Sequence, residues 1–206
     1  MIWSCESMPS KLRVRRIFRP VVMAIARPLA RAGVRPNTIT YFSLLLSLLA
    51  ALVLIMIKSS IVFGILVFFC GLFDGVDGAV ARERNISSDL GAFTDSVVDK
   101  ISEVFILGSV AVAYSGTYLL GLSIEWWVIL AIAGWLMTSY TRSRASSLGV
   151  EDLDIGVGAR SERLFTLVVF SVLNQLLWGL VIVSIMGLAT AGYRFYRYQS
   201  ELINHR

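Results

Sequence analysis

The sequence predicts an all-α, polytopic membrane protein with six transmembrane helices and an N-terminal amphipathic helix at the membrane interface. The chain has 206 residues, of which 56% are hydrophobic, and its mean hydropathy of +0.73 is far above that of a soluble domain. Its apolar residues gather in runs of about 20, the length that crosses a hydrocarbon core. The net charge of +5 alone would fit a nucleic-acid partner. No basic aromatic surface remains once the spans are assigned, so no nucleic-acid partner is expected.

The first helical segment, residues 10–35, mixes basic and apolar side chains. Val21, Val22, Ile25 and Leu29 recur at helical spacing, opposite part of a set of arginines. This pattern predicts a helix that lies on an anionic leaflet. A cleavable signal peptide is disfavoured, because the arginines continue through the stretch that its apolar core would occupy.

Six apolar segments follow a break at Pro36. The expected spans are residues 37–57, 61–80, 90–114 and 126–146, and residues 161–198 are long enough for two more with a turn near 174–178. The predicted division is therefore a tail and interfacial helix (1–35), a membrane domain (36–199) and a C-terminal tail (200–206).

The basic residues predict the orientation of these spans. Of the 19 lysines and arginines, 17 fall on one side, Lys58 falls on the other, and Lys100 lies within the third span. By the positive-inside rule, both termini and the junction of the second and third spans face the cytoplasm. The expected location is thus the cell membrane, with the candidate site on its cytoplasmic side.

Four aspartates occupy that junction. Asp74 and Asp77 are three residues apart, and Asp95 and Asp99 are four apart, so each pair shares one face of a helix. Carboxylates at a bilayer edge are costly and repel one another, unless a divalent cation lies between them. Ligands that are all oxygen favour Mg²⁺, with Mn²⁺ or Ca²⁺ as substitutes.

Small residues and an arginine accompany the aspartates. Gly78 and Ala81 lie beside the first pair, and Gly91 precedes the second pair by one turn. Small residues let helix backbones approach closely in lipid. Arg82 ends the first helix, where a guanidinium can bind phosphate through two parallel hydrogen bonds. Together these residues predict a site for a pyrophosphate or a phosphate ester.

The stretch from Asp74 to Asp99 reads D-x-x-D-G-x-x-A-R-x8-G-x-x-x-D-x-x-x-D, and all eight positions are present at full spacing. It resembles the signature of the CDP-alcohol phosphotransferases, membrane enzymes that make phospholipid headgroups. The resemblance covers roughly residues 36–163. It implies that an alcohol attacks the β-phosphorus of a CDP-linked lipid, either CDP-diacylglycerol or CDP-archaeol, and that CMP leaves. It also implies a homodimer.

The resemblance also implies roles for individual residues. Two Mg²⁺ ions, for which Mn²⁺ can substitute, are held by Asp74, Asp77, Asp95 and Asp99, and Asp99 is also the general base. The CDP-lipid is bound by Asn37, Thr40, Asp74, Gly78, Ala81, Arg82 and Ser88. For Asn37, Thr40 and Ser88, helix capping is the alternative interpretation. Glu103, one turn beyond Asp99, has no assigned role in the site, and the alternatives for it are an extension of the polar cluster and a pairing with Lys100.

Four arginines flank the loop between the fourth and fifth spans, and they suit an acceptor that already carries a phosphate. They are Arg142, Arg144, Arg160 and Arg163. Contact with lipid headgroups is the alternative for each of them.

Residues 139–149 and 159–164 resemble the branch that uses inositol 1-phosphate, which includes the phosphatidylinositol-phosphate and archaetidylinositol-phosphate synthases. The resemblance implies that Arg142, Arg160 and Arg163 bind the acceptor phosphate. Ala159 and Ser161 depart from the E-R-P-E-R-L pattern of that branch. Glycerol 3-phosphate is therefore kept as the second candidate acceptor, ahead of a neutral alcohol or an amino acid.

Two functions of other kinds remain open. An aspartate-rich prenyltransferase would also bind a lipid diphosphate through Mg²⁺, but such enzymes have more spans and lack the A-R-x8-G spacing. An ion-coupled membrane transporter would use the aspartates to bind its coupling ion. Release of CMP from a CDP-lipid distinguishes the transferase from both.

Overall fold

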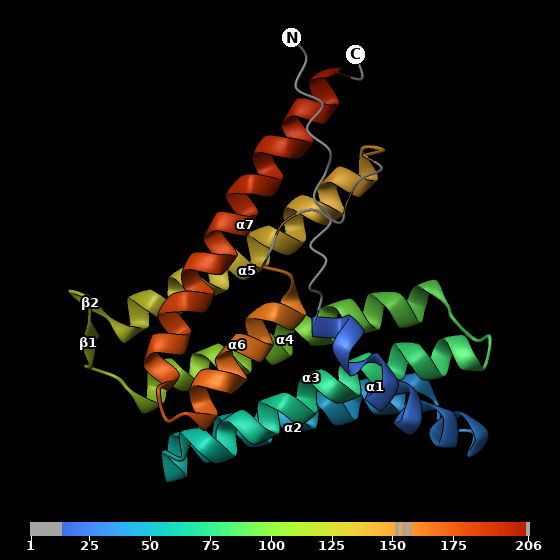
Figure 1. Cartoon of the computed structure of the whole chain (residues 1–206), viewed down its shortest axis with the longest axis horizontal. Coiled ribbons are helices and arrows are strands. Elements are labelled where there is room, and N and C mark those ends of the chain that lie inside the picture. Colours follow the sequence, from blue (N-terminus) through green and yellow to red (C-terminus); the bar gives the residue numbers. More distant parts are fainter. Residues whose placement is uncertain (1–13, 151–152, 154–155, 157, 205–206) are drawn as a thin grey trace.

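The computed structural model is helical except for one short hairpin (Figure 1). It describes residues 14–150, 153, 156 and 158–204. Within these residues it contains seven helices and two strands, in the order α1 (Val14–Arg31), α2 (Pro36–Ile57), α3 (Ser60–Glu83), α4 (Asp89–Ala113), β1 (Tyr118–Leu119), β2 (Leu122–Ser123), α5 (Ile124–Ser147), α6 (Arg160–Val172) and α7 (Leu176–Asn204). The predicted all-α class is thus confirmed, apart from the antiparallel β1–β2 pair in a segment expected to be a loop.

The helix ends follow from local sequence signals. Pro36 begins α2, where the fixed φ of proline suits the first turn. Lys58 ends α2 in the left-handed conformation, with φ 55°. The hydroxyl of Ser59 then caps α3, and that of Ser88 caps α4 by accepting a hydrogen bond from the Gly91 amide at 3.1 Å. These caps fix the two turns that place α2, α3 and α4 side by side.

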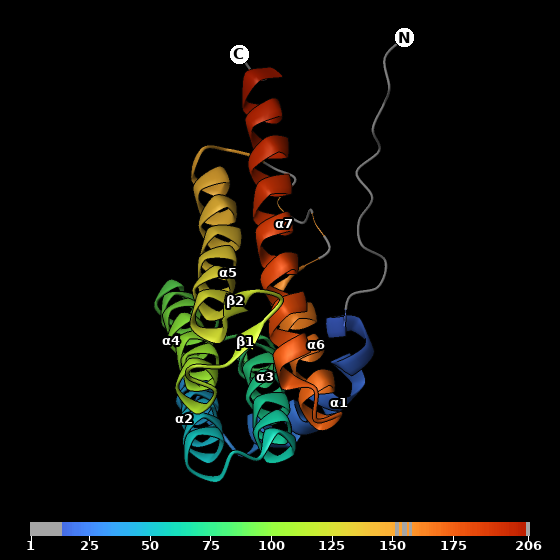
Figure 2. The same cartoon turned by 90° about the vertical axis from the view of Figure 1, so that its left-hand side faces the viewer.

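The helices form two groups. α2 packs against α3 and α4, whereas α5 packs along α7, and α6 joins the groups by contacting both α3 and α7. Figures 1 and 2 show α5 and α7 running together and rising away from α2–α4. Glycines allow the close α5–α7 approach, since a β-carbon at Gly134 would lie 2.7 Å from the backbone nitrogen of Leu188.

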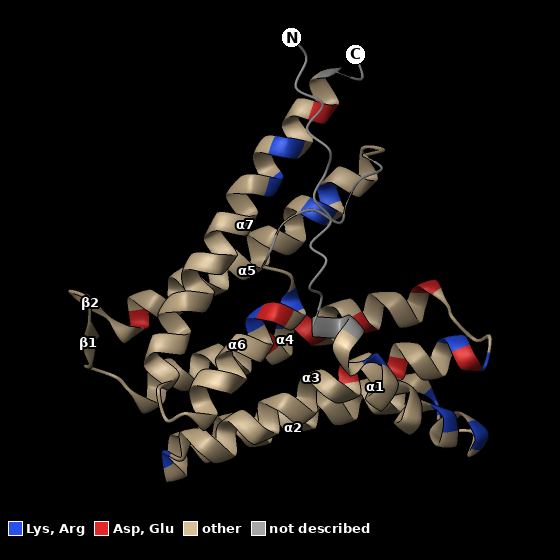
Figure 3. Ribbon diagram, viewed as in Figure 1, with Lys and Arg blue, Asp and Glu red and all other residues tan. Residues whose placement is uncertain are grey.

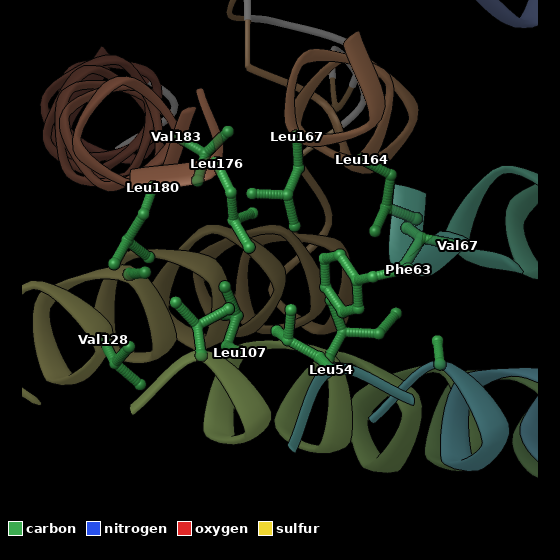
Figure 4. Close-up of a cluster of buried hydrophobic side chains, with 14 of the residues drawn as sticks. Leu54, Phe63, Val67, Leu107, Val128, Leu164, Leu167, Leu176, Leu180 and Val183 are labelled. Carbon is green, nitrogen blue, oxygen red and sulfur yellow. The ribbon is translucent and has the colours of Figure 1, made fainter. Parts of the chain in front are cut away.

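One cluster of buried apolar side chains joins α2 to α7, and Figure 4 shows part of it around Leu54, Phe63 and Leu107. Many large apolar side chains instead point outward, including Met56 (79% exposed) and Phe93 (68% exposed). Such extensive outward-facing apolar surface is typical of helices that contact lipid. Close packing, rather than the hydrophobic effect, then holds the helices together.

Three helical segments in the described part of the chain are long and apolar enough to cross a membrane: Pro36–Ile57, Ser60–Glu83 and Leu176–Ile203. The six expected spans fall on α2–α7, and the chain turns between α6 and α7 close to the predicted position. α6 has only 13 residues. At 1.5 Å per residue it is about 20 Å long, less than the ~30 Å hydrocarbon core, so the six-span count remains a prediction. α7 continues to Asn204, past the predicted boundary at residue 199.

α1 lies across α3 and packs its buried Ala26 in a small cluster with Val76 and Val80. Nη1 of Arg84 donates hydrogen bonds to the carbonyl oxygens of Gly33 and Val34, both at 2.9 Å. The connection between α1 and α2 is therefore tied to the end of α3. α1 covers most of the predicted N-terminal helical segment, and its position at a membrane interface remains a prediction.

Candidate phosphoester and metal site

Charged residues gather where α3, α4 and α6 meet, whereas α2 carries none (Figure 3). At this junction three of the four motif aspartates converge. One carboxylate oxygen from each of Asp74, Asp95 and Asp99 lies within 4.8 Å of the others, and all three side chains are half-buried. A set of carboxylate oxygens this close fits a hard divalent cation such as Mg²⁺ or Mn²⁺.

An arginine from the first turn of α6 bridges two of these aspartates. Arg160 Nη1 lies 2.5 Å from Asp74 Oδ2, and Nη2 lies 2.9 Å from Asp99 Oδ1. Its Nε is 3.2 Å from Glu103 Oε1, an ion pair whose geometry is not that of a hydrogen bond. The Arg160 guanidinium thus lies between carboxylates that would otherwise repel one another. The cluster of aspartates therefore suits a positively charged group.

Asp77 is directed to a different partner. Its carboxylate is buried (4% exposed), and it accepts hydrogen bonds from the Thr40 hydroxyl at 2.6 Å and the Gly78 amide at 2.5 Å. Asp77 is therefore held from α2 and lies outside the three-carboxylate cluster. Its assignment as a metal ligand remains a prediction.

A cavity of about 260 Å³ opens beside the cluster. Its lining contains six of the seven residues expected to bind the CDP-lipid, namely Asn37, Thr40, Gly78, Ala81, Arg82 and Ser88. Asp74, the seventh, belongs to the adjacent cluster. Asp95 belongs to both the cavity lining and the cluster, so the two features form one continuous site.

Glycines keep this cavity open. A β-carbon at Gly91 would lie 3.2 Å from Ser88 Oγ and 3.8 Å from Asn37 Oδ1. A β-carbon at Gly78 would lie 3.3 Å from Nη1 of Arg82. The atoms nearest to these added β-carbons belong to polar side chains and not to the backbone of a neighbouring helix. A larger side chain at either position would therefore enter the space beside the polar groups.

The predicted acceptor arginines occupy different environments. Arg160 lies in the cluster, whereas Arg163, one turn later, is buried (1% exposed) with its guanidinium carbon 4.6 Å from the ring centroid of Trp135. In the described part of the chain, Nε and Nη1 of Arg163 have no hydrogen-bond partner. Arg142 is exposed on the C-terminal half of α5, which rises away from α2–α4 in Figures 1 and 2.

The structure adds residues that the sequence did not single out. Ile86, Ser87 and Ala92 also line the cavity. Glu103 pairs with Lys100, which was one of its two expected alternatives, and it also contacts Arg160. The signal for its place beside the cluster was its position four residues after Asp99, on the same helix face. Arg160 was itself an expected acceptor residue, but its pairing with Glu103 had no signal in the sequence.

A cavity with polar walls, carboxylates that suit a divalent cation and arginines able to bind phosphate define a phosphotransfer site on membrane-type helices. The chain belongs to the CDP-alcohol phosphatidyltransferase family, whose family model matches residues 33–195. It is accordingly a transferase of that type and an integral membrane protein.

Within this family, the chain is similar to two archaetidylinositol phosphate synthases. The chain is 32% identical over 196 residues to the archaetidylinositol phosphate synthase of Pyrococcus horikoshii, covering 95% of this chain and 98% of that one. It is 34% identical over 181 residues to the enzyme of the same name from Methanothermobacter thermautotrophicus, covering 85% and 87%.

Solved structures agree with this assignment. The Mycobacterium tuberculosis phosphatidylinositol phosphate synthase in complex with manganese and citrate matches with a TM-score of 0.73 and 25% identity, over 86% of this chain and 88% of that one. The same enzyme with CDP-DAG bound matches with a TM-score of 0.72 and 23% identity, over 87% and 94%. At 23% identity, the match to the CDP-DAG complex shows that the two proteins share a fold.

Proposed function

We propose that this protein transfers a phosphatidyl-type group from a CDP-linked lipid to a hydroxyl of inositol 1-phosphate and releases CMP. One observation carries the proposal: Asp95 joins the three-aspartate cluster to the cavity that the expected donor-binding residues line. The similarity to two archaetidylinositol phosphate synthases supports inositol 1-phosphate as the acceptor.

The cavity is the proposed place of the CDP group. Asn37, Thr40 and Ser88 offer polar atoms around it, and Arg82 offers a guanidinium for the diphosphate. Asp74, Asp77, Asp95 and Asp99 are the proposed ligands of two Mg²⁺ ions, with Mn²⁺ as a substitute. When bound, these ions would neutralise the diphosphate and favour ionisation of the attacking alcohol.

Asp99 is the proposed general base. Its carboxylate accepts the proton of the acceptor hydroxyl as that oxygen forms a bond to the β-phosphorus of the donor. The bond between the β-phosphorus and the bridging oxygen breaks, and CMP leaves with that oxygen. The lipid product keeps the β-phosphate, so atoms and charge balance without a further reactant. Arg160, which contacts Asp99 at 2.9 Å, can hold the acceptor phosphate close to this base.

Arg163 and Arg142 complete the proposed acceptor set. The support for Arg163 is its buried guanidinium, one turn from Arg160, with two nitrogens that lack hydrogen-bond partners among the described residues. Leaving such a group without an acceptor is costly, which favours a bound anion in the working enzyme. Arg142 rests on the resemblance alone.

We also propose that α2–α7 all cross the membrane and that α1 lies at its cytoplasmic surface. The outward-facing apolar side chains and the placement of the lysines and arginines support this arrangement. Both termini and the site then face the cytoplasm, where soluble acceptors are available. A homodimer is proposed from the family resemblance.

The test is CMP release by the protein reconstituted in liposomes that contain a CDP-lipid. Inositol 1-phosphate, glycerol 3-phosphate, free inositol and serine are compared, each with and without Mg²⁺. We expect release that requires Mg²⁺ and is fastest with inositol 1-phosphate. Asp99→Asn should abolish turnover while it largely preserves CDP-lipid binding. Metal-independent release, or none with any acceptor, would contradict the proposal.

A further inference from the structure

We infer that Glu103 is a positioning residue that holds Arg160 in place for the phosphate of the acceptor, an inference that rests on the proposed function. Glu103 lies on α4, one turn beyond Asp99, and it is buried (3% exposed). Its Oε2 accepts a hydrogen bond from Lys100 Nζ at 2.7 Å, and its Oε1 lies 3.2 Å from Arg160 Nε. Both oxygens therefore face a cation.

These contacts distinguish Glu103 from the cluster aspartates. A buried carboxylate is strongly unfavourable unless it is paired, and Glu103 is paired by Lys100 and Arg160. Its charge is compensated by residues of this chain alone. It therefore has no need of a metal ion, and none of its oxygens belongs to the three-carboxylate group.

The contacts of Arg160 show why this pairing matters. Its two terminal nitrogens contact Asp74 and Asp99, both expected metal ligands, whereas Nε contacts Glu103. Divalent cations at the cluster would claim the oxygens of Asp74 and Asp99. The contact with Glu103 involves no expected metal ligand, so it is the one that remains available to Arg160 in the loaded site.

An arginine anchored through Nε presents Nη1 and Nη2 as a free pair of donors. That fork matches two oxygens of a phosphate group. Because Arg160 is on α6 and its anchor is on α4, Glu103 also fixes the distance between the acceptor phosphate and Asp99 on the same helix. Glu103 thus acts on the acceptor through Arg160 and touches no substrate itself.

The experiment compares Glu103→Gln and Glu103→Asp with the wild type in lipid nanodiscs. Glu83→Gln is the matched control, since it makes the same chemical change at the exposed last residue of α3. Three quantities are measured: Mn²⁺ affinity without substrates, inositol 1-phosphate affinity of the Mn²⁺-loaded protein by calorimetry, and the KM values for acceptor and CDP-lipid.

We expect Glu103→Gln to weaken inositol 1-phosphate binding and raise its KM about tenfold or more. An Arg160 side chain that is no longer held in place would lose at least one hydrogen bond to the charged phosphate, and such a bond contributes at least that factor. Mn²⁺ affinity and the KM for CDP-lipid should stay within about threefold of wild type, a change smaller than one ordinary hydrogen bond. Glu103→Asp should recover part of the lost affinity, and Glu83→Gln should match the wild type. Retained Mn²⁺ binding shows that the variants are folded at the site.

Unchanged acceptor binding in Glu103→Gln would overturn the inference, as would an equal loss of Mn²⁺ or CDP-lipid affinity. If Glu103→Gln does not fold, Glu103→Asp decides by the same comparison of acceptor and donor. A wild type that binds glycerol 3-phosphate instead would overturn only the proposed acceptor, and the variants would be compared with that ligand. A wild type that binds neither phosphorylated alcohol would overturn both proposals.

Discussion

Replacing Arg160 by glutamine should strengthen metal binding while it impairs use of the acceptor. Arg160 contacts Asp74 at 2.5 Å and Asp99 at 2.9 Å, so a divalent cation must take these oxygens from a guanidinium. A hydrogen bond between charged groups contributes about 1.5–3 kcal/mol. Removal of even one such competing contact corresponds to about a tenfold gain in metal affinity.

The Arg160→Gln protein in nanodiscs is titrated with Mn²⁺, and the free ion is quantified at each step by electron paramagnetic resonance. Arg144→Gln is the control, because it removes the same charge from an exposed position on α5 and should leave affinity within about twofold at physiological salt. We expect Mn²⁺ to bind Arg160→Gln about tenfold more tightly than wild type, with a higher KM for inositol 1-phosphate. Equal or weaker Mn²⁺ binding would refute the idea that Arg160 and the metal compete for the same oxygens.

Two glycine substitutions test the packing that shapes the site and the fold. Gly91→Ala would place a β-carbon 3.2 Å from Ser88 Oγ, so we expect CDP-lipid affinity to fall roughly fivefold in a binding assay, and unchanged affinity would argue against this wall of the cavity. Gly134→Ala would bring a β-carbon to 2.7 Å from the Leu188 nitrogen, and we expect a loss of about 1–3 kcal/mol, seen as a lower Tm in detergent. Gly108→Ala is the control for both substitutions, since no atom lies within 4 Å of its added β-carbon. If Gly108→Ala lowered the Tm as much as Gly134→Ala, the loss of stability could not be attributed to the α5–α7 contact.

The convergence of the motif aspartates was predictable because their spacing and the small residues beside them report local helix geometry. Their spacing places Asp95 and Asp99 on one face of α4, and Asp74 on α3 joins them. The different orientation of Asp77 was not predictable, because its partner Thr40 is 37 residues away on another helix. A hydrogen bond between helices leaves no periodic trace in the sequence.

The same limit applies to the arginines. Arg160 and Arg163 are three residues apart and look equivalent in the sequence, yet one bridges carboxylates and the other lies over Trp135. Which one meets the cluster depends on how α6 packs against α3 and α7. The division of residues 161–198 was predictable, since the chain turns between Val172, the end of α6, and Leu176, the start of α7, close to the turn expected near 174–178. Composition does not tell whether a helix of 13 residues crosses the membrane by itself.

The hydrogen bonds from Arg84 to the carbonyl oxygens of Gly33 and Val34 have a mechanical consequence. They join the connection that precedes Asn37 to the end of α3, the helix that carries Arg82, and both of these residues line the cavity. A change in the tilt of α1 must therefore either move the residues at the mouth of the cavity or break the hydrogen bonds from Arg84.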